Sequence, residues 1–92
     1  MIRTFKHAGL KRYFDTGKAK GIPADMAKRI QVRLNVLNRA RELHDLKLPG
    51  FGFHSLQGDR KREHALTVTA NYRLTFRFEN SDVLDLNLED YH

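Results

Sequence analysis

The sequence predicts an α+β fold, in which two N-terminal helices pack on one face of a small twisted antiparallel sheet. Two observations indicate this class. Apolar residues recur at helical spacing in the first half of the chain, and apolar and polar residues alternate in the second half. A chain of 92 residues buries one small core. We therefore expect a single domain that extends over residues 1–92.

The first helix is expected over about residues 6–15. Leu10, Tyr13 and Phe14 fall at helical spacing within this segment. Gly17 follows as a C-terminal stop, because glycine readily adopts the left-handed conformation that ends many helices.

The second helix is expected to have Pro23 in its first turn, where the fixed φ of proline is compatible with a helix, and to extend to about Arg41. Residues 46–52 then form an irregular connection, and residues 2–5, ahead of both helices, could form a short strand or an extended lead-in. The second helix carries one apolar stripe, made of Met26, Ile30, Leu34 and Leu37. The basic residues of the helical half are expected on a solvated face: Lys11, Arg12, Lys18, Lys20, Lys28, Arg29, Arg33 and Arg39.

Three alternating segments, residues 66–70, 72–78 and 84–88, predict strands with one apolar face each. A two-residue turn between the last two would set Phe76 opposite Asp85 and mix the faces. A three-residue turn at residues 80–82 keeps apolar residues together, and we predict it because a one-residue slip moves every side chain to the other face. The predicted partners are Phe78 and Leu84, Phe76 and Leu86, Leu74 and Leu88, Arg77 and Asp85, Arg73 and Glu89, and Tyr72 and Asp90.

The charge of the chain favours a polyanionic partner. Lys and Arg number 17 against 11 Asp and Glu, which gives a net charge of +6. Nucleic acid is the first candidate for that partner, and an anionic membrane is the second. The chain has no cysteine, and hence no disulfide or thiolate metal site. It also has no apolar run long enough to span a bilayer and no signal-peptide pattern at its start, so we expect a cytoplasmic protein.

The last three residues, Asp90, Tyr91 and His92, are the clearest candidate for chemistry. They follow the alternating run at residues 84–88, so a strand is expected to carry the chain to its end. A carboxylate, a phenol, an imidazole and the terminal carboxylate would then share one support. Such groups can transfer protons, as a metal-free nuclease requires. The ordinary alternative for a terminus is a solvated tail.

An ordered set of segments resembles the HigB branch of the RelE/ParE toxin superfamily, and the resemblance covers essentially the whole chain. It implies a RelE-like fold and a toxin of a type II toxin–antitoxin system. It also implies a ribosome-dependent endoribonuclease, an mRNA interferase that cleaves mRNA during translation by attack of the 2′-hydroxyl on phosphate, without metal or cofactor. The segments are Met1–His7, Phe53–Arg60, Ala70–Arg73, Leu74–Phe76 and Glu89–His92.

The resemblance also implies partners. They are a cognate helix-turn-helix antitoxin (HigA-like), mRNA with the ribosome and its RNA, and operator DNA through the antitoxin complex; no membrane is implied. The basic residues of the helices could then hold ribosomal RNA, with an affinity that falls with salt.

The catalytic residues that the resemblance implies are His54, Arg73, Asp90, Tyr91 and His92. The histidines would serve as acid or base near neutrality, Asp90 would orient an imidazole, Tyr91 would stack on a base, and Arg73 would contact the scissile phosphate. Acid and base are not assigned separately, because interacting groups titrate together.

Each of the catalytic candidates has a structural alternative. His54 could be a loop histidine packed near Phe51 and Phe53, and Arg73 could be a surface arginine paired with Glu89. Regular pairing places Arg73 and Asp90 on opposite faces of the sheet, so a twist, bulge or kink is expected at the tail if both act together.

Further RNA contacts are implied at Gln57, Arg60, Lys61 and Asn71. The chain departs from the family at Gln57, where Lys is common, and at Thr69, where Arg is common. Arg60, Lys61 and Arg62 could compensate for these lost cations. The departures also leave open a catalytically weakened homologue that acts mainly as an antitoxin-binding partner and co-repressor of its own operon.

Three other functions are less well supported. Gyrase poisoning, as in the ParE branch, does not require the acid–base tail. The five histidines show no metal-ligand spacing. Ser55 next to His54 lacks a third member for a catalytic triad.

Overall fold

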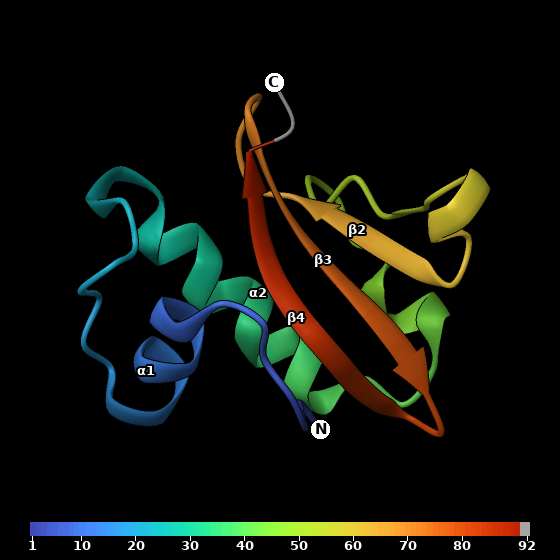
Figure 1. Ribbon diagram of the computed structural model, residues 1–92, viewed down its shortest axis with the longest axis horizontal. Coiled ribbons are helices and arrows are strands. Elements are labelled where there is room, and N and C mark those ends of the chain that lie inside the picture. The colour runs from blue at the N-terminus through green and yellow to red at the C-terminus, as the bar shows by residue number, and fades with distance from the viewer. Residues whose placement is uncertain (91–92) are drawn as a thin grey trace.

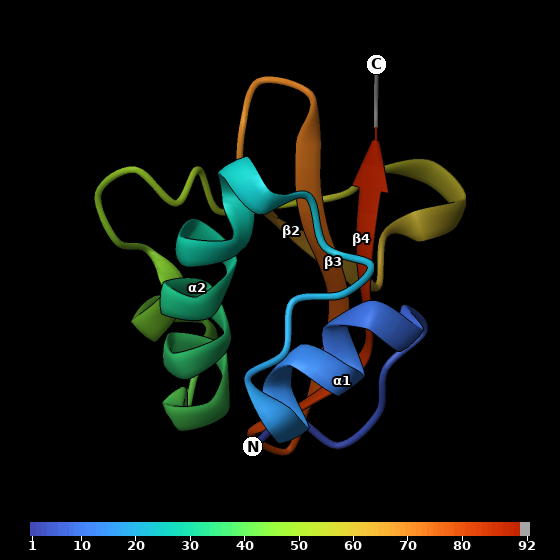
Figure 2. The ribbon, with the colours of Figure 1, turned by 90° about the vertical axis from the view of Figure 1, so that its left-hand side faces the viewer.

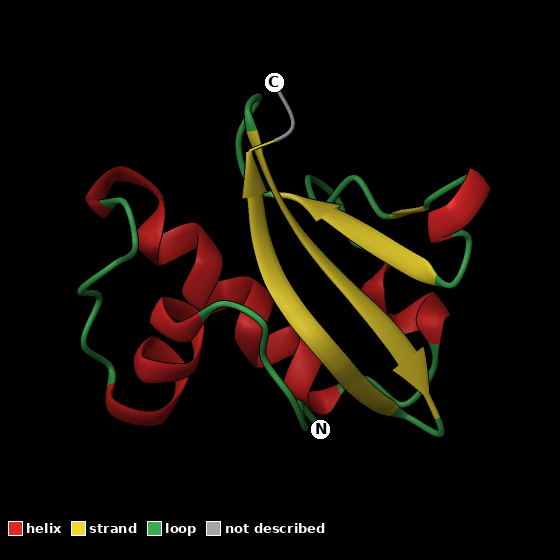
Figure 3. Cartoon of the chain, viewed as in Figure 1, coloured by secondary structure: helices red, strands yellow, loops and turns green. Residues whose placement is uncertain are grey.

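A computed structural model describes residues 1–90 of the protein (Figure 1). In this range two α-helices lie against one face of an antiparallel sheet with strand order β1-β2-β3-β4, as Figures 1 and 3 show. The predicted α+β class is confirmed. Tyr91 and His92 lie outside the described residues. The elements are α1 (Ala8–Thr16), the 3₁₀ turn η1 (Ala24–Met26), α2 (Ala27–Arg39), η2 (Leu43–Leu46), β1 (His54–Ser55), η3 (Gly58–Arg60), β2 (Glu63–Thr67), β3 (Tyr72–Glu79) and β4 (Asp82–Asp90).

Helix α1 begins two residues later than predicted, because His7 caps it. The His7 Nδ1 accepts a hydrogen bond from the Leu10 N–H at 3.1 Å, which satisfies one of the amide groups that a helix start leaves unpaired. The predicted stop at Gly17 is confirmed: its φ is +77°, and its N–H donates to the Tyr13 carbonyl at 2.9 Å.

Helix α2 is shorter than predicted at both ends. Pro23 precedes a single 3₁₀ turn, and the non-helical backbone of Met26, with φ of −118°, separates that turn from α2. The helix then ends at Arg39. The predicted apolar stripe is confirmed, since all four of its members are buried. Figure 2 shows α1 and α2 side by side over the sheet. The core lies between them and the strands, and includes Leu10, Ile30, Leu34, Leu37, Leu66, Leu74, Phe76, Val83 and Leu86.

The N-terminal segment runs beside β4 instead of forming a strand of its own. Ile2 and Phe5 make isolated parallel bridges to Val83 and Leu86. The Arg3 N–H donates to the Val83 carbonyl at 2.8 Å. The short strand that residues 2–5 could form is therefore reduced to bridges that cover part of the β4 edge.

Strand β2 lies earlier than the predicted segment at residues 66–70, because the chain turns there. The Thr69 hydroxyl accepts hydrogen bonds from the N–H groups of Asn71 and Tyr72 at 3.3 and 3.2 Å, and it thereby closes the turn between β2 and β3. β1 was not predicted: two residues are too few to show an alternating pattern.

The hairpin of β3 and β4 combines both registers that the sequence allowed. Asn80 and Ser81 form a two-residue turn with φ of 51° and 66°, so Phe78 pairs with Val83. Asp85, at φ 55°, then lies at a bulge that shifts the register by one residue.

Beyond the bulge, the predicted pairs of Leu74 with Leu88, Arg73 with Glu89 and Tyr72 with Asp90 are confirmed. The prediction near the turn is wrong: Leu84 pairs with Arg77 on the other face, and Val83 is buried in its place.

Within residues 1–90, the structure contains no helix long and apolar enough to cross a membrane.

Candidate functional site

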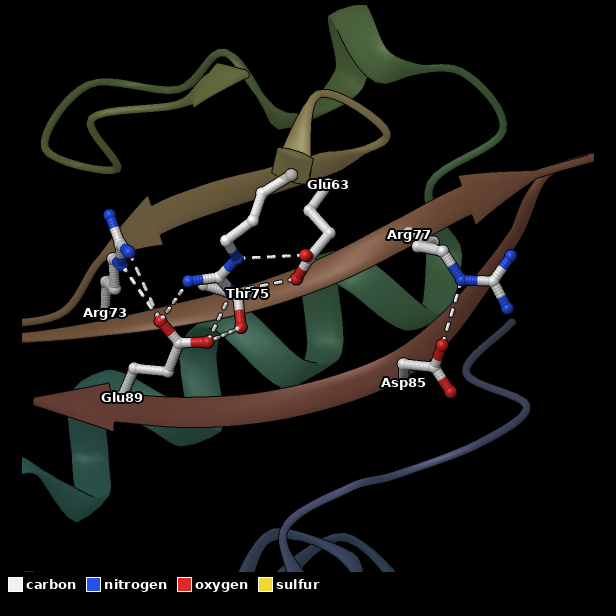
Figure 4. Close-up of polar contacts among 7 residues, drawn as sticks. Glu63, Arg73, Thr75, Arg77, Asp85 and Glu89 are labelled. Carbon is white, nitrogen blue, oxygen red and sulfur yellow. Dashed lines mark hydrogen bonds and ion pairs between the residues drawn. The ribbon is translucent and has the colours of Figure 1, made fainter. Parts of the chain in front are cut away.

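The sheet face opposite the helices carries a connected set of charged and polar side chains, which Figure 4 shows in close-up. We call this set the polar sheet face: Arg60, Glu63, Arg73, Thr75 and Glu89. Three strands and η3 contribute to it. The described residues enclose no pocket, so this face is an open surface.

Glu89, near the end of β4, is the common acceptor of this set. Arg60 approaches it with two nitrogens, Nη1 at 3.0 Å from Oε1 and Nη2 at 2.5 Å from Oε2. The Nε and Nη2 atoms of Arg73 lie 3.3 and 3.2 Å from Oε1. The buried Thr75 hydroxyl donates to Oε2 at 2.9 Å. Three side chains from β3 and η3 therefore converge on one carboxylate of β4.

Arg60 also binds a second carboxylate. Its Nε and Nη2 atoms donate to the two oxygens of Glu63 at 2.9 and 2.8 Å. Planar guanidinium groups match carboxylates in this two-point manner. Arg60 was predicted to compensate for missing positive charge, but the two carboxylates that surround it offset its own charge.

Hydrogen bonding keeps these groups ionised at neutral pH. The bonds from Arg60, followed by those from Thr75 and Arg73, outweigh burial and lower the pKa of Glu89 to about 2. The Arg60 bonds also lower the pKa of Glu63, and both carboxylates raise the pKa of Arg60. The formal charges of two arginines and two glutamates cancel on this face.

His54, in β1, is exposed, and the structure fixes its neutral tautomer. Its Nδ1 lies 2.9 Å from the Gly52 carbonyl oxygen. A carbonyl can only accept, so Nδ1 carries the hydrogen and Nε2 of the neutral ring holds the lone pair. The alternative was a loop histidine packed near Phe51 and Phe53, but His54 lies in a strand and is exposed. The Phe53 ring stacks on His64, with centroids 5.7 Å apart.

Strand pairing places His54 and Arg73 on the same face of the sheet. His54 pairs with Ala65, which pairs with Thr75, and Arg73 lies two residues before Thr75 on β3. Strands are spaced about 4.8 Å apart, so His54 lies about 10 Å across the sheet from β3. A phosphodiester and its neighbouring nucleotides can bridge such a span.

Asp90 lies in the opposite orientation, as regular pairing predicts. It pairs with Tyr72, whereas Arg73 pairs with Glu89. A register shift lies between Thr75 and Arg77. The twist, bulge or kink expected at the tail extends beyond the described residues and stays a prediction. The predicted contributions of Tyr91 and His92 lie outside those residues.

The remaining candidates for RNA contact are surface groups. Gln57, Lys61 and Asn71 are exposed, and Gln57 and Lys61 flank η3. Thr69 holds the turn beside Asn71 through its hydroxyl. No group of three or more histidine, aspartate or glutamate residues within 1–90 is arranged to hold a metal ion.

Arg33 was expected on the solvated face, but the residue is buried, at only 8% exposed. Its guanidinium donates to the backbone carbonyls of Thr67, Arg29 and Gly50 at 2.7, 3.0 and 3.0 Å. It also lies 4.6 Å from the ring centroid of Phe51. Burial lowers its pKa. Its spacing from Ile30 and Leu37, which places it on the apolar stripe, was the available signal.

Arg33 supports the segment that leads to His54. It joins α2 to Gly50 and to the end of β2, and the Thr67 N–H donates to the Phe51 carbonyl at 2.7 Å. Gly52 follows with φ of +56°, where an added Cβ would come within 2.5 Å of the Thr67 hydroxyl oxygen. Only glycine is compatible with this close approach. The Gly52 carbonyl orients His54. Its segment is therefore held against Thr67 of β2 and, through Arg33, against α2.

Comparison with known proteins identifies the class. Residues 3–92 match the family described as RelE-like toxin of type II toxin–antitoxin system HigB. The fold is shared with YafQ from E. coli, at a TM-score of 0.63 and 13% identity over 99% of this chain and 92% of that one. It is also shared with the YoeB–YefM complex from Staphylococcus aureus, at a TM-score of 0.61 and 15% identity over 100% and 95%. The fold is that of RelE-like toxins.

The chain belongs to the HigB-like toxin family of type II toxin–antitoxin systems. It is 45% identical to Endoribonuclease HigB of Proteus vulgaris over the full length of both chains. It is 27% identical to Toxin HigB-1 of Vibrio cholerae serotype O1 over 99% of this chain and 98% of that one. These findings confirm the resemblance and the predicted toxin class.

Proposed function

We propose that this toxin is an endoribonuclease that cleaves mRNA during translation, by attack of a ribose 2′-hydroxyl on the adjacent phosphate. The observation that carries the proposal is the orientation of His54. With Nδ1 donating to the Gly52 carbonyl, Nε2 is the proton acceptor on the exposed side of the ring. The family and the endoribonuclease from Proteus vulgaris support this class of activity.

The chemistry needs a base, a cation and an acid. His54 takes the proton from the 2′-hydroxyl as the new oxygen–phosphorus bond forms. Arg73 stabilises the extra negative charge on the phosphorane. The bond to the 5′-oxygen then breaks, and the tail, Asp90 to His92, returns a proton to that oxygen. This scheme assigns the acid to the tail and uses no metal.

The exposed basic residues of the helical half supply the affinity for ribosomal RNA. Lys11, Arg12, Lys18, Lys20, Lys28 and Arg29 are all exposed on a chain with a net charge of +6. Neutralising phosphates releases counterions, so binding weakens as salt increases. We also propose a single domain that acts in the cytoplasm and is inhibited by a helix-turn-helix antitoxin, with operator DNA bound through that complex.

The test is translation in vitro with the purified toxin and mapping of mRNA 5′ ends, with and without ribosomes. We expect His54→Gln to lower ribosome-dependent cleavage about 10²- to 10⁴-fold, the usual contribution of a general base. His44→Gln, at another exposed histidine, is the matched control and should cleave normally. Growth arrest by the wild-type toxin without ribosome-dependent cleavage would refute the proposal.

A second candidate is the weakened homologue that acts mainly as a co-repressor. The charge balance on the polar sheet face favours it, because Glu63 and Glu89 offset Arg60 and Arg73. Gln57 adds no positive charge nearby. This function predicts operator binding by the toxin–antitoxin complex together with no mRNA cleavage at high toxin concentration. Cleavage that His92→Gln abolishes would exclude it.

A further inference from the structure

We propose that Glu89 is a positioning residue, which orients Arg60 and Arg73 as a joint phosphate-binding pair and anchors the tail that follows it. This inference rests on the proposed function and deepens it. Glu89 itself does not contact the substrate in this scheme. It acts through the two arginines and through the backbone of β4.

The first argument is the convergence of donors on Glu89. Arg73 comes from the neighbouring strand β3. Arg60 comes from η3, which directly precedes β2, and β3 lies between β2 and β4 in the sheet. Arginine side chains are flexible, so two of them meet at one place only when a fixed group holds both. The Thr75 hydroxyl fixes that group by donating to Oε2 of Glu89 at 2.9 Å (Figure 4).

The second argument is how Glu89 engages each guanidinium. The Nε and Nη2 atoms of Arg73 both approach Oε1, which fixes the plane of its guanidinium against the sheet. Arg73 is mostly covered, with a side chain 18% exposed, whereas Arg60 is 38% exposed. Arg60 is therefore the more accessible member of the pair.

The third argument is the place of Glu89 in the chain. It directly precedes Asp90, Tyr91 and His92. Its bonds to β3 and η3 restrain the end of β4 at this point. Strand ends otherwise fray, because their last residues have few partners. A restrained Glu89 therefore holds the end of β4, where the tail begins, against β3 and next to Arg60 of η3.

Asp85 offers a matched control on the same strand. Its carboxylate accepts from the Arg77 Nε at 2.9 Å, so Asp85→Asn removes one negative charge and one arginine pair. Glu89→Gln also removes one negative charge, together with the pairs that Glu89 makes with Arg60 and Arg73. If charge alone mattered, both variants would bind RNA slightly better. If Glu89 positions the arginines, only Glu89→Gln should be impaired.

The experiment measures kcat and KM for cleavage of ribosome-bound mRNA, with ¹⁵N NMR of the arginine side-chain N–H groups in the free toxin. We expect Glu89→Gln to lower kcat/KM at least about tenfold and Asp85→Asn to stay within about threefold of wild type. The Nη–H signals of Arg60 and the Nε–H signal of Arg73, which bind Glu89, should shift and exchange faster in Glu89→Gln, and the Nε–H signal of Arg77 should not. Asp85→Asn should show the reverse pattern.

Equal cleavage by the two variants, faster cleavage by Glu89→Gln, or unchanged Arg60 and Arg73 signals would overturn the inference. Should Glu89→Gln fold poorly, Thr75→Val removes one bond to the carboxylate at constant shape, and it should change cleavage and NMR signals in the same direction by less. A wild-type toxin that cleaves no RNA refutes the proposed function, whereas the NMR comparison still tests Glu89.

Discussion

The two faces of the sheet are built from the same strands, but different forces hold them. On the helix side, Leu74, Phe76 and Leu86 are fully buried and pack against α1 and α2. On the polar sheet face, directional bonds to Glu89 do the corresponding work. Apolar packing depends on volume and is tolerant of exact atom positions, whereas hydrogen bonds require particular atoms. The first face therefore specifies the fold, and the second holds functional groups in place.

Two histidines on adjacent strands repeat this contrast. His64 pairs with Phe76, its ring lies between those of Phe53 and Phe76, and burial lowers its pKa. Its Nδ1 lies 2.8 Å from the Ser55 hydroxyl oxygen. His54, on the other face, is exposed and held through a backbone carbonyl. The same residue type packs against aromatic rings on one face, and on the other it is the residue that we propose as the base.

The largest expected loss of stability comes from a substitution on the apolar face. Phe76→Ala should lower the free energy of unfolding by about 3–5 kcal/mol, because it removes a fully buried ring and leaves a cavity. Arg77→Ala, its neighbour on the other face, should cost far less, since exposed ion pairs contribute little. Urea denaturation measures both. Similar costs for the two variants would contradict the division of roles.

Arg33→Met tests the one charged side chain among residues 1–90 that is buried on the helix side. We expect a loss of about 2–4 kcal/mol in the free energy of unfolding, because backbone carbonyls of Thr67, Arg29 and Gly50 lose a charged donor. Arg33→Lys should not restore it, since an ammonium cannot match this planar arrangement. Arg39→Met, at an exposed position on the same helix, is the control. Thermal or urea unfolding that does not separate Arg33→Met from the control would be the contrary result.

Acid should weaken the two faces in separate pH ranges. The lowered pKa of His64 means that the unfolded chain takes up this proton first, so stability begins to fall below about pH 6.5. The lowered pKa of Glu89 stabilises the fold above about pH 4.5, and this contribution is lost as pH falls to about 2. The Glu89 contribution is on the order of 1–2 kcal/mol after allowance for solvent screening.

Urea titrations across pH measure these two losses. His64→Gln should remove the upper one and Glu89→Gln the lower one. A single transition that neither substitution alters would show that other groups control the acid response.

The sequence predicted most of the fold because hydrophobic periodicity reports burial directly. The stripe on α2, the stop at Gly17 and the alternation along β3 were all recovered. The register was recovered only from Thr75 to the tail. The bulge at Asp85 reverses the sheet faces on which Val83 and Leu84 lie. It alters the alternating sequence pattern too little for the pattern to predict it.

The candidate site was recovered in composition but not in arrangement. His54 and Arg73 share a face as the pattern of strands allows, and the pairing of Arg73 with Glu89 was anticipated. The joining of Arg60 to Glu89 was not anticipated, since it links η3 to β4 across 29 residues of chain. Such long-range contacts leave no periodic signal in a sequence.

By itself, the sequence determined the class of fold, the buried faces and the family, because these depend on local spacing and on an ordered set of motifs. Only the tertiary structure decided which charged groups meet. It placed two carboxylates around Arg60, buried Arg33 against backbone carbonyls, and fixed the proton of His54 on Nδ1. Each of these facts depends on the distance between atoms from separate elements, and packing sets that distance.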